Sequence, residues 1–78
     1  MTFTIIDARP GTTPGVYSAS KLISTVGVGD VRVPVLLNCR NSTYAEVNLN
    51  TGAISIYPMK AEFAAGRFCI RRYGWFGD

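Results

Sequence analysis

The stretch Val31-Arg32-Val33-Pro34-Val35-Leu36-Leu37-Asn38-Cys39-Arg40 decides how this chain folds. Its odd positions are all apolar, its even positions are mostly polar, and only Leu36 breaks the alternation. Because successive side chains of a strand point to opposite faces, this period of two predicts a half-buried β-strand. Pro34 has no amide proton to donate, which places this part of the strand at a sheet edge or a bulge. An edge of that kind is open to a partner chain.

The next segment predicts a hairpin. Alternation resumes after the polar turn 40–42, with Ala45, Val47 and Leu49 on one side, and Asn50-Thr51-Gly52 then reverses the chain into a strand over residues 53–57. Gly52 occupies the position where such a turn needs a left-handed backbone. If the apolar side faces the core, Tyr44 and Tyr57 share the exposed face as a candidate aromatic surface for a carbohydrate or peptide. The alternative is that they are scattered surface tyrosines without a special role.

The N-terminal part contains a strand, a loop and an ambiguous segment. Residues 2–6 are β-branched or aromatic and predict a strand, and the Pro- and Gly-rich residues 10–15 predict an irregular loop. Residues 16–26 fit either a strand or a helix that is capped by a serine. We favour a strand from Leu22 onward, because Gly27 and Gly29 suit a turn into the strand described first.

The C-terminal part predicts one short helix and a last strand. Pro58 suits the start of a helix, good or neutral helix formers follow over residues 59–65, and Gly66 stands where a C-terminal cap belongs. Residues 67–73 then predict a strand. The expected fold is mainly β, a small five-stranded antiparallel barrel or open sandwich with one short helix at about residues 59–65.

Size raises the question of what stabilises the fold. The 78 residues form a single expected domain, 1–78, with 47% hydrophobic and only 17% charged residues. Domains this small usually need a disulfide, a metal ion or a partner chain. We favour two buried free thiols at Cys39 and Cys69, because the N-terminus carries no secretory signal. A disulfide between them stays open as the alternative.

Composition argues against catalysis and metal binding. The chain has no histidine and two cysteines, too few ligands for a zinc site, and its acidic residues stand singly. Gly27-Val28-Gly29 leads into a strand, whereas a dinucleotide-binding motif leads into a helix. We therefore expect no enzyme, no metal and no small-molecule cofactor. No apolar stretch approaches the length of a membrane span, and with no signal peptide the expected location is the cytoplasm, or a virion for an assembly subunit.

The C-terminal residues are the strongest candidate for binding. Residues 67–78 contain three arginines and one aspartate, so they carry two of the three net positive charges of the chain. Arginine interleaved with aromatic rings is typical of surfaces that bind single-stranded nucleic acid and of protein interfaces. Alternatively, the aromatic residues belong to the core and the arginines pair with carboxylates or cover apolar surface. The candidate residues are Arg67, Arg71, Arg72, Tyr73, Trp75 and Phe76.

No family motif is complete in this chain. In overall style, as a short β chain rich in Thr, Asn, Gly and Tyr, it resembles many small virus or phage accessory and virion proteins. This leads to the hypothesis of a non-enzymatic protein-interaction or assembly module, such as a virion subunit, that associates with itself or with a protein partner. Two alternatives remain: a small β-barrel nucleic-acid-binding protein, and a virus-encoded inhibitor of a host protein.

Overall fold

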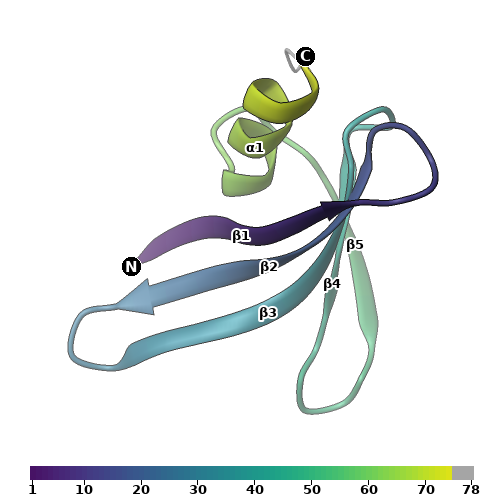
Figure 1. Ribbon diagram of the computed structural model, residues 1–78. Helices are drawn as coiled ribbons and strands as arrows, with labels where there is room; N and C mark the ends of the chain where they lie inside the picture. The colour runs from purple at the N-terminus through teal and green to yellow at the C-terminus, as the bar shows by residue number, and fades with distance from the viewer. Residues whose placement is uncertain (75–78) are drawn as a thin grey trace.

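The structure is a computed structural model that describes residues 1–74 of the chain (Figure 1). Five strands are followed by one helix in this part of the chain. The elements are β1 (Thr2–Pro10), β2 (Val16–Thr25), β3 (Gly29–Asn38), β4 (Thr43–Val47), β5 (Ile54–Pro58) and α1 (Ala64–Tyr73).

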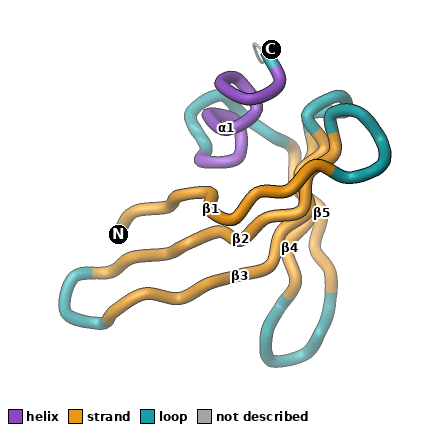
Figure 2. The backbone as a smooth tube through the Cα atoms, in the orientation of Figure 1, coloured by secondary structure: helices purple, strands orange, loops and turns teal. Residues whose placement is uncertain are grey.

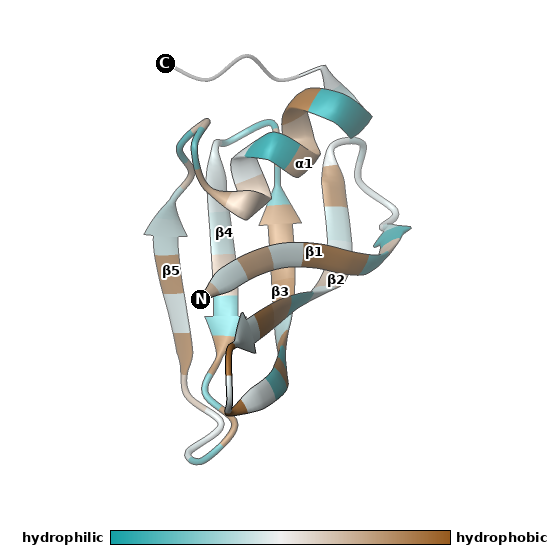
Figure 3. Ribbon diagram, turned by 90° about the vertical axis from the view of Figure 1, so that its left-hand side faces the viewer, coloured by the Kyte–Doolittle hydropathy of each residue, from teal (hydrophilic) through white to brown (hydrophobic). Residues whose placement is uncertain are grey.

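The five strands form one antiparallel sheet in the order β1-β2-β3-β4-β5, so each strand pairs with its neighbour in the chain. β4 and β5 run at a steep angle to β1–β3 (Figure 1), and β1 crosses in front of β3 and β4 in the turned view (Figure 3). The sheet is therefore curled but open, because β1 and β5 are its two edges. The expected class, a mainly β open fold with one short helix, is confirmed.

The first strand extends beyond the predicted residues 2–6 because it contains a bulge. Ile6 pairs with Ser20 and Arg9 with Ser18, so two residues of β1 lie opposite one residue of β2. Asp7, the first of the two, has a left-handed backbone with φ 55°, which the short polar side chain of an aspartate tolerates. A bulge of this kind bends the strand and increases its twist, and β1 continues to Pro10.

The ambiguous segment 16–26 is a strand up to Thr25. β2 pairs with β3 along its whole length, from Val16 opposite Asn38 to Thr25 opposite Gly29. The turn between them has Gly27 at φ 81° and Gly29 at φ 100°, as the glycine spacing predicted. Pairing with β3, which the local sequence of this segment does not specify, makes it a strand and not a helix.

Pro34 lies where β3 has a single neighbour. The ladder with β2 includes Pro34, whereas the ladder with β4 covers Val35–Asn38. Of the two settings predicted for Pro34, a sheet edge or a bulge, the structure shows the edge. Figure 2 shows how the β2–β3 turn and the β4–β5 turn extend away from the helix.

The helix was predicted in the wrong place. It covers Ala64–Tyr73, so residues 67–73 are helical and form no strand, and residues 59–63 connect β5 to the helix. Ala64, Ala65, Phe68 and Cys69 are buried at helical spacing, and packing of this stripe on the sheet outweighs the short alternation read from the sequence. Gly66 lies inside the helix, and the C-terminal cap is Gly74 with φ 86°.

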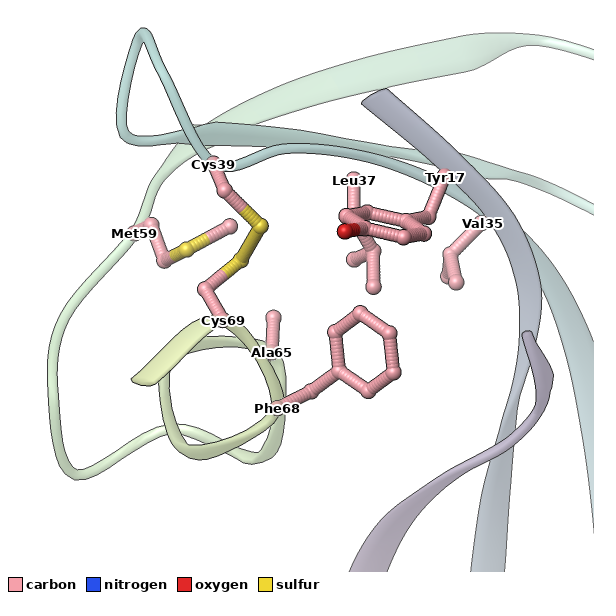
Figure 4. Close-up of a cluster of buried hydrophobic side chains, with 8 residues drawn as sticks. All are labelled: Tyr17, Val35, Leu37, Cys39, Met59, Ala65, Phe68 and Cys69. Carbon is pink, nitrogen blue, oxygen red and sulfur yellow. A yellow bond between two sulfur atoms is a disulfide. The ribbon is translucent and has the colours of Figure 1, made fainter. Parts of the chain in front are cut away.

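A disulfide joins the helix to the sheet. Cys39, just after β3, is bonded to Cys69 of α1, with their Cα atoms 5.6 Å apart (Figure 4). The expectation of two free thiols was wrong, because docking of the helix brings together two cysteines that are 30 residues apart in sequence. The disulfide is surrounded by a core of Tyr17, Val35, Leu37, Met59, Ala65 and Phe68.

Candidate functional site

Tyr44 and Tyr57 share one face of the sheet, as predicted. This face is the one that carries the helix, whereas the prediction placed them on the exposed face. Tyr44 pairs with Tyr57 across β4 and β5, with ring centroids 5.4 Å apart. Leu37 of β3 lies opposite Tyr44 and is completely buried. Because directly paired residues point to the same side of a sheet, Tyr44 and Tyr57 lie on the side that carries the helix. The prediction that Tyr44 faces away from the core was therefore wrong.

Burial also affects the chemistry of Tyr44. Desolvation, and then the nearby negative charge of Glu46 and the neighbouring Tyr57, raise the pKa of the Tyr44 phenol above its usual value. The shift therefore moves the titration of this phenol further above physiological pH, at which a tyrosine is protonated in any case.

The opposite side of the sheet is apolar and exposed. Leu36 is 50% exposed, Ile54 67% and Ile56 73%, although β-branched and leucine side chains usually occupy a core. Leu36 pairs with Ala45, and Ala45 with Ile56, so these side chains form one row across three strands. The alternating hydrophobic bands of β5 are visible in Figure 3. We call this surface the outer apolar face; its members are Leu36, Ala45, Val47, Ile54 and Ile56.

Sequence reasoning missed the outer apolar face for an identifiable reason. Ala45 and Val47 are more apolar than Tyr44 and Glu46, so the pattern assigned them to the core. Leu36, which breaks the alternation of β3, was the available signal. A leucine at an even position shows that the polar side of β3 also carries apolar surface.

The residues of the predicted C-terminal site lie partly on the helix and partly outside the described residues. Arg67, Arg71, Arg72 and Tyr73 are exposed on α1, whereas Trp75 and Phe76 lie outside the described residues. Arg67 donates a hydrogen bond to the carbonyl of Glu62, and the guanidinium of Arg72 lies 5.8 Å from the ring centroid of Tyr17. The interleaved surface expected from a strand is thus absent among residues 67–73.

Part of the positive charge nevertheless collects at one end of the molecule. A Cβ atom built on Gly15 would lie 2.5 Å from the Arg40 side chain and 3.1 Å from the Tyr73 ring, so these two side chains meet over Gly15. Arg71 and Arg72 are in the last turn of α1, where positive charge interacts favourably with the helix dipole. We call Arg40, Arg71 and Arg72 the basic end. Within residues 1–74 the ion pairs are Lys21–Glu46 and Arg32–Asp7, so none of these arginines is in one.

The described residues contain neither a metal-binding cluster nor a membrane-spanning helix. No group of three or more Cys, Asp or Glu side chains in residues 1–74 is arranged to hold a metal ion. In the same residues, no helix combines the length and the apolar character that crossing a membrane requires. No protein-family model matches the chain, and no curated protein or solved structure matches it either.

Proposed function

We propose that this chain is a small non-enzymatic assembly module that associates with a second copy of itself through the outer apolar face. The observation that carries the proposal is the exposure of Leu36, Ile54 and Ile56 on a continuous sheet surface. Monomeric proteins rarely leave such a contiguous apolar patch uncovered. A virion subunit, the more specific expectation from the sequence, is one form that such a module takes.

The charge distribution favours a second copy as the partner. Each chain has a net charge of +3, which opposes association wherever like charges meet. The outer apolar face contains no charged side chain, so two copies can pack there without placing like charges in contact. A two-fold contact uses the same patch on both molecules, and a neutral apolar patch is complementary to itself.

Face-to-face packing explains the surface better than edge pairing. β5 is an edge strand, and pairing it with β5 of a second copy would leave Ile54 and Ile56 uncovered. Two sheets packed face to face at about 10 Å bury both apolar faces, as in a β-sandwich. Removing this area from water would supply the driving force.

The test is the oligomeric state over a range of concentrations. We expect a dimer by light scattering and sedimentation, and we expect Ile56→Lys to be monomeric, because an unpaired ammonium would be buried in the contact. The matched control is Val28→Lys in the β2–β3 turn, where the valine is similarly exposed but lies outside the outer apolar face. A wild-type protein that is monomeric at high concentration, or equal effects of the two substitutions, would reject the proposal.

A second candidate function, binding of nucleic acid, is favoured by the basic end. Its three arginines are exposed and free of ion pairs within residues 1–74, as contact with phosphates requires. Titration of a labelled single strand at two salt concentrations tests this candidate, with Arg40→Gln/Arg71→Gln compared with Arg32→Gln. Binding that is absent at low salt, or unaffected by the double substitution, would exclude it.

A further inference from the structure

A groove opens on the helix side of the sheet, opposite the outer apolar face. It lies between the N-terminal half of β1 and the beginning of α1 and has a volume of about 620 Å³. Pockets of roughly 300–1,000 Å³ are the usual size for small-molecule sites. Its floor comes from the sheet through Lys21, Val35 and Tyr44, and Phe3 and Phe63 stand on its two sides.

The helix that borders the groove is fastened to the core of the molecule. Phe68 and Cys69 belong to the core cluster, and Cys69 is bonded to Cys39 (Figure 4). The first helical turn lines the groove with the small side chains of Ala64 and Ala65 and with Arg67. Because alanine side chains are small, they fill little of the space between the helix and the sheet.

Three aromatic side chains from different elements line the groove. Phe3 comes from β1, Tyr44 from β4 and Phe63 from the residue before α1, and the Tyr44 and Phe63 rings meet edge to face at 6.4 Å. Phe3 and Phe63 both remain exposed. Rings held at different angles provide both face and edge contacts for another aromatic ring.

Two of the charged side chains that line the groove, Lys21 and Arg67, already have partners. The Lys21 ammonium forms an ion pair with Glu46 and lies 5.2 Å from the Phe3 ring centroid. Arg67 donates to the backbone carbonyl of Glu62, and Glu62 also lines the groove. The side-chain charges balance, because Lys21 and Arg67 are matched by Glu46 and Glu62. The side chains of the groove therefore favour a neutral ligand over an anion or a cation.

The Tyr44 hydroxyl is a polar group of the groove that a ligand can use. Within residues 1–74 the Tyr44 hydroxyl makes no hydrogen bond to the protein. A phenol is protonated at neutral pH, so this hydroxyl can donate to an acceptor on a ligand.

We propose that this groove binds a small neutral aromatic molecule carrying a hydrogen-bond acceptor, with the ring among Phe3, Tyr44 and Phe63 and the acceptor at the Tyr44 hydroxyl. The proposal is independent of self-association, because the two surfaces lie on opposite sides of the sheet. It assigns the groove a ligand site that the sequence does not reveal, since its residues come from distant segments.

The test uses three probes of matched size and the full-length protein. The probe 2-acetylnaphthalene is neutral with an acceptor, 2-ethylnaphthalene has no acceptor, and 2-naphthoate is an anion. Titrations followed by amide chemical shifts should give saturable binding of 2-acetylnaphthalene, with shifts concentrated at residues 3–5, 21, 44 and 63–67. We expect 2-acetylnaphthalene to bind about five- to tenfold more tightly than 2-ethylnaphthalene, as one added hydrogen bond would give.

Two variants separate the ring contact from the hydrogen bond. Tyr44→Phe should abolish the preference for 2-acetylnaphthalene over 2-ethylnaphthalene, and Phe3→Ala should weaken both probes. Phe3 is exposed, so its removal leaves the core intact, and Val26→Ala in the β2–β3 turn is the control that should change neither affinity. Non-saturable binding, shifts centred on the outer apolar face, tighter binding of 2-naphthoate, or an unchanged preference in Tyr44→Phe would overturn the proposal.

Discussion

Leu37 and Tyr44 lie directly opposite each other on β3 and β4, and Leu37 is completely buried. This pair assigns the faces of the sheet. Because the register places Tyr44 beside a core residue, the alternate residues Ala45 and Val47 point to the other side, together with Ile54 and Ile56. Tyr44 thus lines the groove, and the aliphatic residues of β4 and β5 belong to the outer apolar face.

The disulfide should provide a large share of the stability. Closing a separation of 30 residues stabilises a fold by about 3 to 4 kcal/mol in the loop-entropy model. We expect Cys39→Ala/Cys69→Ala to lower the free energy of unfolding in urea by that amount. A reductant should destabilise the wild type and leave the double variant unchanged. Detection of two free thiols in the unfolded, unreduced protein would contradict this prediction.

Gly66 should not tolerate a side chain, although it lies inside a helix. Alanine normally favours a helix over glycine by about 1 kcal/mol. Here a Cβ atom would overlap the Lys60 carbonyl oxygen, which belongs to the backbone and cannot rotate away. We expect Gly66→Ala to destabilise the protein by about 2 to 3 kcal/mol in urea unfolding.

A matched comparison for Gly66 is the cap residue Gly74, where an added Cβ atom would meet nothing within 4 Å but φ is +86°. Gly74→Ala should cost only the left-handed backbone penalty of about 1 kcal/mol. If Gly66→Ala proves stabilising, the close approach of the helix to residue 60 is wrong.

The two ion pairs should differ in strength. The Lys21 and Glu46 side chains are 18% and 19% exposed, whereas Arg32 and Asp7 are 65% and 63% exposed. Water screens the second pair more strongly. A double-mutant cycle with Lys21→Met and Glu46→Gln should give a coupling of about 1 to 2 kcal/mol.

The corresponding cycle with Arg32→Gln and Asp7→Asn should give less than about 0.5 kcal/mol. Asparagine is chosen at position 7 because it also tolerates the left-handed backbone found there. Equal couplings for the two pairs would contradict the burial of Lys21 and Glu46.

Stability should fall at alkaline pH because of Tyr44. Burial and Glu46 raise the pKa of this phenol in the folded protein above the unfolded value of 10.0. Above that pH the unfolded chain loses the proton more readily than the folded one, so the free energy of unfolding decreases as pH rises. Urea unfolding at pH 9 and at pH 11 should show a smaller decrease in Tyr44→Phe than in the wild type. An identical decrease in both proteins would contradict this prediction.

Local pattern was sufficient for several elements. The alternation of β3 and the glycines of the β2–β3 and β4–β5 turns were predicted because each depends on neighbouring residues alone. The helix was displaced because Phe68-Cys69-Ile70 fits a short strand or a helix equally well, and Gly66 was read as a cap. Contact between α1 and the core, which involves residues far away in sequence, resolves that ambiguity.

The sequence by itself determined the mainly β class, the strand alternation of β3 and the turns with left-handed glycines, because these depend on side-chain period and backbone sterics within a few residues. Only the tertiary structure decided that Cys39 is bonded to Cys69, that Tyr44 faces the helix, and that Leu36 and Ile56 form an exposed surface. These features depend on register and on the docking of α1. A one-residue change of register exchanges the two faces of a strand, and local composition carries too little information to specify it.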